Sequence, residues 1–146
     1  MNGKQFSGNR SSGSQNYRRD DYSATLKPKI IDASILDAGV KDVSLIKEWG
    51  YFLADGRDSV KTSQLRKFFG AVKKIQADFD NLKGEIVLLS PKLAYAVGRN
   101  QKSKIKDLYN VLSPLIESIG EDKKRFKNFV NVFEAIVAYH KEIAKE

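Results

Sequence analysis

The stretch 62–79, TSQLRKFFGAVKKIQADF, decides the fold class. Its apolar side chains recur every three or four residues, which is the spacing of one face of an α-helix. On such a helix Arg66 and Lys73 share one flank and Lys67 and Lys74 share the back, because residues seven apart stack in line along the axis. The apolar face consists of Leu65, Phe68, Phe69, Val72, Ile75 and Phe79. The stretch therefore predicts a long amphipathic helix with cations on its polar sides.

The same helical periodicity continues on both sides of this stretch. It predicts a first helix from Val43 to about residues 55–56, one helical phase over 82–97, a helix over 105–119, and a last helix from about Glu121. Gly120 is a typical helix stop. The sequence therefore predicts an all-α fold, a compact bundle of about five helices with short links and no internal repeat.

Two prolines interrupt the helical pattern. Pro91 lies within the phase over 82–97 and leaves three arrangements open. It kinks one continuous helix, or Ser90 caps a second helix with Pro91 at its first position, or a short strand covers residues 85–89. Pro114 falls on the polar side of the predicted helix 105–119, where we expect a kink.

The composition excludes several classes of protein. The chain has 146 residues, which fits one domain, with no cysteine and a single histidine. Without cysteine there are no disulfides, thiolate zinc sites, iron–sulfur clusters or thiol nucleophiles. His140 falls on the apolar face of the last helix, which predicts a packed or interfacial side chain. Paired acids such as Asp78 and Asp80 are typical of caps and turns. We therefore expect no enzyme activity, no catalytic residue, no metal and no cofactor.

No targeting or membrane segment is evident. No apolar run approaches the roughly 20 residues of a membrane span, and the start of the chain has no apolar signal core. We expect a cytoplasmic protein with no membrane partner. In the first helix Trp49, Tyr51 and Phe52 are many large rings for one side of a helix, and they fit either the core or a partner interface.

The charge is distributed unevenly along the chain. Residues 1–29 carry six basic and two acidic residues among few aliphatics, which predicts a disordered basic arm before a domain over 30–146. Residues 30–60 carry three basic and six acidic residues, and residues 61–106 carry eleven basic and three acidic. Residues 107–146 are nearly neutral. The overall charge of +8 is therefore concentrated in the middle of the domain.

Three predicted helix starts carry the wrong charge. Free N–H groups and the helix dipole favour acidic residues at a helix start, and each misplaced cation costs roughly 0.3–1 kcal/mol. The starts near residues 61–67, 90–92 and 102–106 nevertheless carry Lys61, Arg66, Lys67, Lys92, Lys102, Lys104 and Lys106. A bound phosphate would reverse this penalty, because it would gain the N–H groups, the dipole and the cations together. The alternative is a solvated charged face.

We therefore predict that the middle of the chain binds a nucleic-acid backbone. Arg99, next to Gly98, fits RNA contact and also a plain helix end, where a cation is favourable. No P-loop or dinucleotide glycine pattern is present. The predicted RNA-binding residues are Lys61, Thr62, Ser63, Arg66, Lys67, Lys73, Lys74, Lys92, Arg99, Lys102, Lys104 and Lys106.

Three ordered motifs resemble one known family. They are KTSQLR over 61–66, KLAYAVGR over 92–99 and FEAIVAYHK over 133–141. In this order and spacing they resemble the small subunit of the type III-A CRISPR effector, the Csm complex. The likeness covers roughly residues 40–145.

The resemblance implies a non-catalytic all-α protein of antiviral defence. It implies that several copies stack beside the backbone subunits, between the large subunit and the far end of the complex. These copies contact the target RNA and help to hold the guide–target duplex. The first two motifs then make Arg66 the foremost RNA contact, followed by Arg99 and Lys92. The third motif is expected to form packing and intersubunit surface, so it gives His140 no catalytic role.

Three other functions compete with this interpretation. A stand-alone RNA-binding or ribosome-associated protein would share the basic surface. A protein–protein adaptor would use that surface on an acidic partner and bind no RNA at any salt. A small nuclease would need partners around His140 that the sequence does not place there.

The acidic first helix and basic middle also suit head-to-tail stacking of identical copies, or a dimer.

Overall fold

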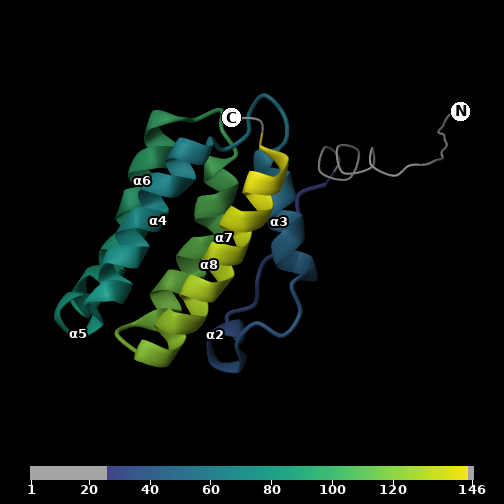
Figure 1. Ribbon diagram of the computed structural model, residues 1–146. Coiled ribbons are helices and arrows are strands. Elements are labelled where there is room, and N and C mark those ends of the chain that lie inside the picture. Colours follow the sequence, from purple (N-terminus) through teal and green to yellow (C-terminus); the bar gives the residue numbers. More distant parts are fainter. Residues whose placement is uncertain (1–25, 145–146) are drawn as a thin grey trace, which may run out of the picture.

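The computed structural model describes residues 26–144, and within that range it contains helices and no strand (Figure 1). The long helices are α3 (Ser44–Ala54), α4 (Thr62–Ala77), α6 (Leu89–Arg99), α7 (Ile105–Ile119) and α8 (Lys123–Ile143). The short ones are α2 (Ile35–Ala38), α5 (Phe79–Leu82) and the 3₁₀ helix η1 (Lys83–Leu88). The predicted all-α bundle is confirmed, whereas most of the predicted arm, residues 1–25, lies outside the described residues.

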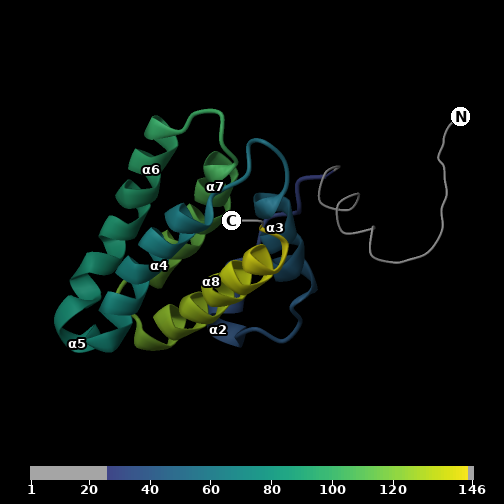
Figure 2. The same cartoon turned by 45° about the horizontal axis from the view of Figure 1, so that its top comes forward.

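The long helices run up and down in alternation. Helices α3, α6 and α8 run in one direction, and α4 and α7 run in the other (Figures 1 and 2). Helices α4 and α6 form a hairpin on one side of the molecule, joined at its tip by α5 and η1. Helices α2 and α3 lie on the opposite side, so the acidic and basic parts of the sequence end up on different sides of the domain.

Helix α8 lies at the centre and supplies the largest buried side chains. Phe126, Phe129 and Phe133 follow one another along its inner face, with ring centroids 6.4 and 6.5 Å apart. Phe68 of α4 meets Phe133 edge to face at 5.2 Å, and Phe79 of α5 lies 5.7 Å from Phe126. Because aromatic rings bury much apolar area, this row fixes the place of α4 against α8.

The connection between α4 and α6 differs from all three predicted arrangements. The described residues there form α5 and a 3₁₀ segment, and Pro91 is the third residue of α6. The first-turn N–H groups of a helix have no intrahelical partner, so a proline at this position removes no hydrogen bond. Ser90 is not the cap, and its hydroxyl lies 3.3 Å from that of Ser113 in α7. Residues 85–89 form no strand.

Other predicted boundaries are confirmed. Helix α3 ends at Ala54, and α7 ends at Ile119, directly before Gly120, whose φ of 60° lies in the left-handed region that glycine favours. The Asp122 carboxylate accepts a hydrogen bond of 2.8 Å from the Arg125 amide and caps α8. Pro114 lies on the exposed side of α7, inside the helix, as predicted.

The sequence does not predict α2. This helix has four residues and buries only Leu36, so it shows no periodic apolar pattern. Side chains of α8 hold it in place. The Arg125 guanidinium donates to the Asp37 carboxylate at 2.9 Å, which raises the pKa of Arg125, and Asn128 donates to the Leu36 carbonyl at 2.7 Å. Farther towards the N-terminus, the Trp49 indole donates to the Lys29 carbonyl at 2.8 Å. Residues at the end of the predicted arm therefore contact the bundle.

Helices α3 and α8 form the most extensive pairing in the bundle, and at Gly50 they lie too close for a side chain between them. A Cβ atom at this position would lie 2.5 Å from the Tyr139 Cβ, 2.9 Å from the His140 amide nitrogen and 3.0 Å from the Ile136 carbonyl oxygen. Two of these three atoms are backbone, so a side chain here requires the helices to separate.

We therefore expect Gly50→Ala to lower the free energy of unfolding by about 2 kcal/mol or more, as overpacking of a tight core does. The matched control is Gly70→Ala in the middle of α4, where an added Cβ meets nothing within 4 Å. That change should raise stability by up to about 1 kcal/mol through helix propensity. Urea denaturation followed by circular dichroism measures both, and equal stability of Gly50→Ala and the wild type would contradict the close approach.

Candidate nucleic-acid interface

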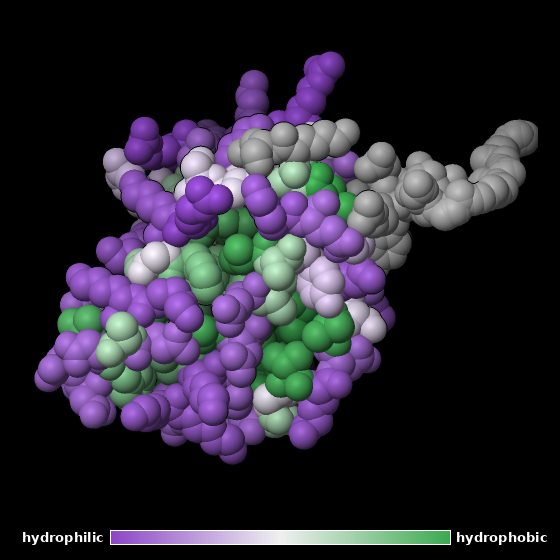
Figure 3. Space-filling model, viewed as in Figure 1, coloured by the Kyte–Doolittle hydropathy of each residue, from purple (hydrophilic) through white to green (hydrophobic). Residues whose placement is uncertain are grey.

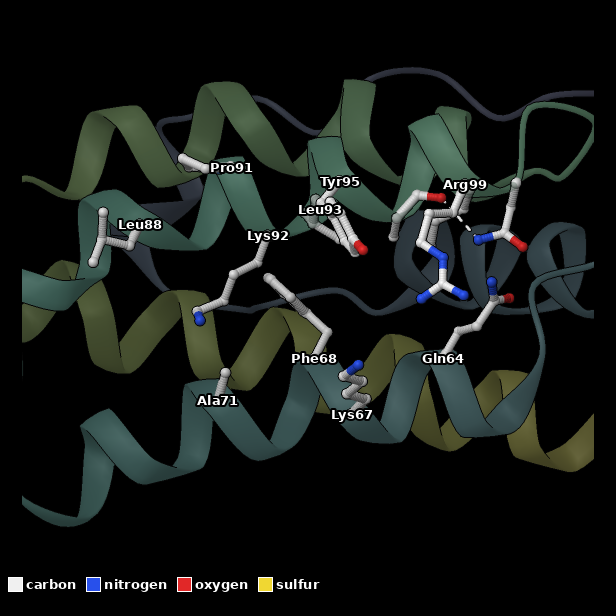
Figure 4. Close-up of a pocket in the computed structure, with 13 residues that line it drawn as sticks. Gln64, Lys67, Phe68, Ala71, Leu88, Pro91, Lys92, Leu93, Tyr95 and Arg99 are labelled. Atoms are coloured by element: carbon white, nitrogen blue, oxygen red, sulfur yellow. Dashed lines mark hydrogen bonds between the residues drawn. The ribbon is translucent and has the colours of Figure 1, made fainter.

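A groove of about 790 Å³ runs between α4 and α6 (Figure 4). Its apolar side chains include Phe68 and Leu93, which are buried and form its floor. Three cations line it: Lys67 from α4, and Lys92 and Arg99 from α6. Figure 4 shows the Lys67 and Arg99 side chains extending towards the space between the two helices. The groove is therefore apolar at its base and positive at its rims.

The helix spacing explains this arrangement. On α4, Phe68 belongs to the buried stripe, and Lys67 is its exposed neighbour on the side that faces α6. On α6, Lys92, Tyr95 and Arg99 follow at intervals of three and four residues, so they lie on one face of the helix. The Arg99 guanidinium carbon lies 5.7 Å from the centroid of the Tyr95 ring. Helix α4 thus contributes one cation to the groove, and α6 contributes two on one face.

Among residues 26–144, no acidic residue lines the groove. The acidic residues of the segment 61–106 are Asp78, Asp80 and Glu85, and they lie at the hairpin tip, in or beside α5 and η1. Figure 3 shows hydrophilic side chains over most of one face of the molecule, with hydrophobic side chains visible in the hollows between them. An anionic ligand would therefore meet attraction along the length of the groove.

The predicted site residues fall into several groups. Lys67, Lys92 and Arg99 are brought together in the groove. Arg66 is exposed but does not line it. The remaining predicted residues outside the groove are Lys61, Thr62, Ser63, Lys73, Lys74, Lys102 and Lys106, of which all but the half-buried Thr62 are exposed.

The three helix starts do not converge on one place. Helices α4 and α7 begin at the same end of the bundle, and α6 begins at the opposite end (Figures 1 and 2). At two of these starts a side chain already accepts a local hydrogen bond. Gln64 Oε1 accepts from the Lys61 amide at 2.9 Å, and Ser103 Oγ accepts from the Ile105 amide at 3.1 Å. The groove, and not the helix starts, is therefore the place where the predicted cations gather.

Lys104 requires a correction. The residue is only 9% exposed, and its ammonium donates to the carbonyl oxygens of Phe52 at 2.9 Å and Asp55 at 2.8 Å. The Asp58 carboxylate lies 3.8 Å away, and the Phe52 ring centroid lies 4.3 Å away. Phe52 lies in the last turn of α3 and Asp55 is its C-cap residue, so the ammonium lies at the end of the helix that favours a cation. Lys104 therefore belongs to the core, and we remove it from the predicted RNA-binding residues.

Sequence reasoning missed Tyr95 as a residue of this site. The signal was its spacing, because Lys92, Tyr95 and Arg99 share one helical face.

The prediction for His140 is confirmed: it is 1% exposed, and its Nε2 lies 2.6 Å from the Val60 carbonyl oxygen. Trp49 and Tyr51 are buried, which assigns them to the interior of this chain.

Residues 26–144 contain no cluster of three or more histidine, cysteine or acidic side chains able to hold a metal ion. No helix in the same range is long and apolar enough to cross a bilayer.

The fold and the groove define a small all-α protein with a cationic surface between two helices. The family model described as Csm2 Type III-A matches residues 41–146, and the chain therefore belongs to the Csm2 family, the small subunits of type III-A CRISPR complexes. This confirms the resemblance seen in the three motifs, and it implies association with the other Csm subunits. Comparisons with curated proteins and with solved structures give no match.

The place of Lys104 generates a stability prediction. We expect Lys104→Met to lower the free energy of unfolding by about 2–3 kcal/mol, because two carbonyl groups at the end of α3 lose their donor. The control is Lys106→Met, an exposed lysine two residues along, for which we expect a change within about 0.5 kcal/mol. Urea denaturation measures both, and similar values for the two variants would show that Lys104 contributes no more than a surface lysine.

Proposed function

We propose that this Csm2 subunit binds the target RNA strand and the guide–target duplex through the α4–α6 groove and the exposed cations around it, without catalysing a reaction. The observation that carries the proposal is the lining of the groove by Lys67, Lys92 and Arg99, with no acidic side chain from the described part of the chain beside them. Contacts from lysine and arginine to phosphate position a strand without reading its sequence. A subunit that accompanies any target needs binding of this kind.

Membership of the Csm2 family favours a role inside the complex over a stand-alone RNA-binding or ribosome-associated protein. The adaptor alternative would place an acidic protein on the groove in place of RNA. It differs in its salt dependence, because release of counterions from RNA gives a log–log slope of about −0.7 for each phosphate contact.

Neutralising two groove cations tests the RNA-binding proposal. We expect the double variant Lys67→Gln/Lys92→Gln to weaken binding of a labelled single-stranded RNA and to reduce the salt slope by about 1.4. The control is Lys124→Gln/Lys127→Gln, which removes the same charge from exposed positions in the first turns of α8. Fluorescence anisotropy from 50 to 300 mM salt, with several unrelated sequences, gives affinity and slope. Equal losses in both variants would show that net charge, and not the groove, binds the strand.

We also propose that copies of this subunit stack head to tail, or pair as a dimer. The basis is the dipolar surface: the segment 30–60, with six acidic residues, lies on the α2–α3 side, and the segment 61–106, with eleven basic residues, lies mainly on the α4–α6 side. Opposite charges on opposite sides of identical copies attract in a head-to-tail array.

Charge reversal separates assembly from RNA binding. We expect Lys73→Glu/Lys74→Glu, two exposed positions on the flank and the back of α4, to reduce the number of copies retained in the purified complex as well as its affinity for target RNA. Native mass spectrometry counts the copies. Loss of RNA binding with an unchanged copy number would overturn the stacking proposal and leave the RNA-binding proposal in place.

A further inference from the structure

Tyr95 is exposed, and its ring is not part of the hydrophobic core. Its side chain is 66% exposed, and it is the one aromatic residue among the large, exposed apolar side chains of residues 26–144. The aromatic rows of α8 and α4 pack into the core, whereas Tyr95 lies over the groove between α4 and α6 (Figure 4). An exposed aromatic ring in a groove is a surface on which a flat ligand can stack.

The groups around the ring have the chemistry of a stacking site. The Arg99 guanidinium, also flat, lies 5.7 Å from the ring centroid, and the floor beside it consists of Phe68, Leu93 and Ala96. Arginine planes and aromatic faces both stack on nucleobases. The volume of about 790 Å³ lies in the range that holds small organic ligands.

The cations of the groove favour a ligand that carries negative charge next to its flat group. Lys67 and Lys92 belong to the same groove, from α4 and α6 respectively. A ligand that satisfies the ring, the apolar floor and both lysines carries a planar group between phosphates. A nucleotide of a single strand has this composition, because its base can leave the stack while the backbone continues on either side.

We propose that the α4–α6 groove takes up an unstacked nucleobase of the bound RNA against Tyr95 and Arg99, while the neighbouring phosphates lie on Lys67 and Lys92. The inference rests on the proposed RNA binding and adds to it a pocket for the base. Stacking of this kind tolerates every base, since each has a π-face. It therefore strengthens binding without adding sequence preference.

A second copy of this chain is the less favoured occupant. A symmetric pairing through the groove would place the three cations of one copy against the same three cations of the other, which repel. An acidic protein segment would satisfy the lysines, but it brings no flat group for Tyr95 and Arg99.

The test compares two RNA strands of equal charge. One is a 12-nucleotide oligouridylate, and the other has the same length with abasic ribose units at its central positions. We expect the full chain to bind the first about tenfold more tightly, within the range measured for base–aromatic stacking. Tyr95→Ala should remove this preference and Tyr95→Phe should keep it. Lys67→Gln/Lys92→Gln should weaken binding of both strands by the same factor and leave their ratio unchanged.

Three results would overturn the inference, and they are distinguishable. Equal binding of both strands by the wild type removes the base pocket but leaves backbone binding in place. Absence of binding to either strand at 50 mM salt removes the proposed function as well. If Tyr95→Ala changes the sedimentation coefficient of the protein but not the ratio of affinities, the groove is a contact between protein copies. Because Tyr95 is exposed, its replacement leaves folding nearly unchanged, and circular dichroism verifies this.

Discussion

The apolar face of α8 is the constraint on which the rest of the structure depends. Its row of phenylalanines needs cover from several sides, and α3, α4, α7 and α2 supply that cover. Gly50 sets the distance of one of these helices, since it lets α3 approach the backbone of α8 at residues 136–140. With the inner face of α8 covered in this way, α6 has its main contacts with other helices. It packs against α7 and α4 instead, at the outside of the bundle.

The groove is a consequence of this outer position. A helix packed on two neighbours leaves part of its surface exposed, and on α6 that part carries Lys92, Tyr95 and Arg99. The short helical segments at the hairpin tip let the chain reverse direction without filling the space between α4 and α6. Pro91 supports the start of α6 there, because the first turn requires no amide from it. The cations that line the groove are thus held in place by the core, to which they themselves contribute little.

Much of the fold could be predicted because its signals are local. The periodicity of apolar residues located the long helices, Gly120 and Asp122 marked an end and a start, and His140 was correctly assigned to the interior. Helix α2 was missed because it has four residues and one buried side chain, and its stability comes from Arg125 and Asn128, about 90 residues away. Periodicity contains no information on such contacts.

The site was predicted less completely, for the same reason. Three of the predicted cations meet in the groove, because they lie on helices that pair as neighbours in the hairpin. Lys104 has the same sequence surroundings as its exposed neighbours, Lys102 and Lys106. Its burial depends on carbonyl groups at the end of α3, some 50 residues earlier. A charge pattern therefore cannot distinguish Lys104 from Lys102 and Lys106.

The pairing of α3 with α8 has a consequence for the order in which the chain folds. The Tyr51 hydroxyl donates to the Glu142 carboxylate at 2.7 Å across 91 residues of sequence, so the first long helix is held by the last. A ribosome releases α3, α4, α6 and α7 before α8 exists, and until then their apolar faces have no common partner. Contacts of such long range form late and slow the folding reaction. Synthesis of the final helix is therefore the step that completes the core, because a chain that stops short of it lacks the buried row Phe126, Phe129 and Phe133.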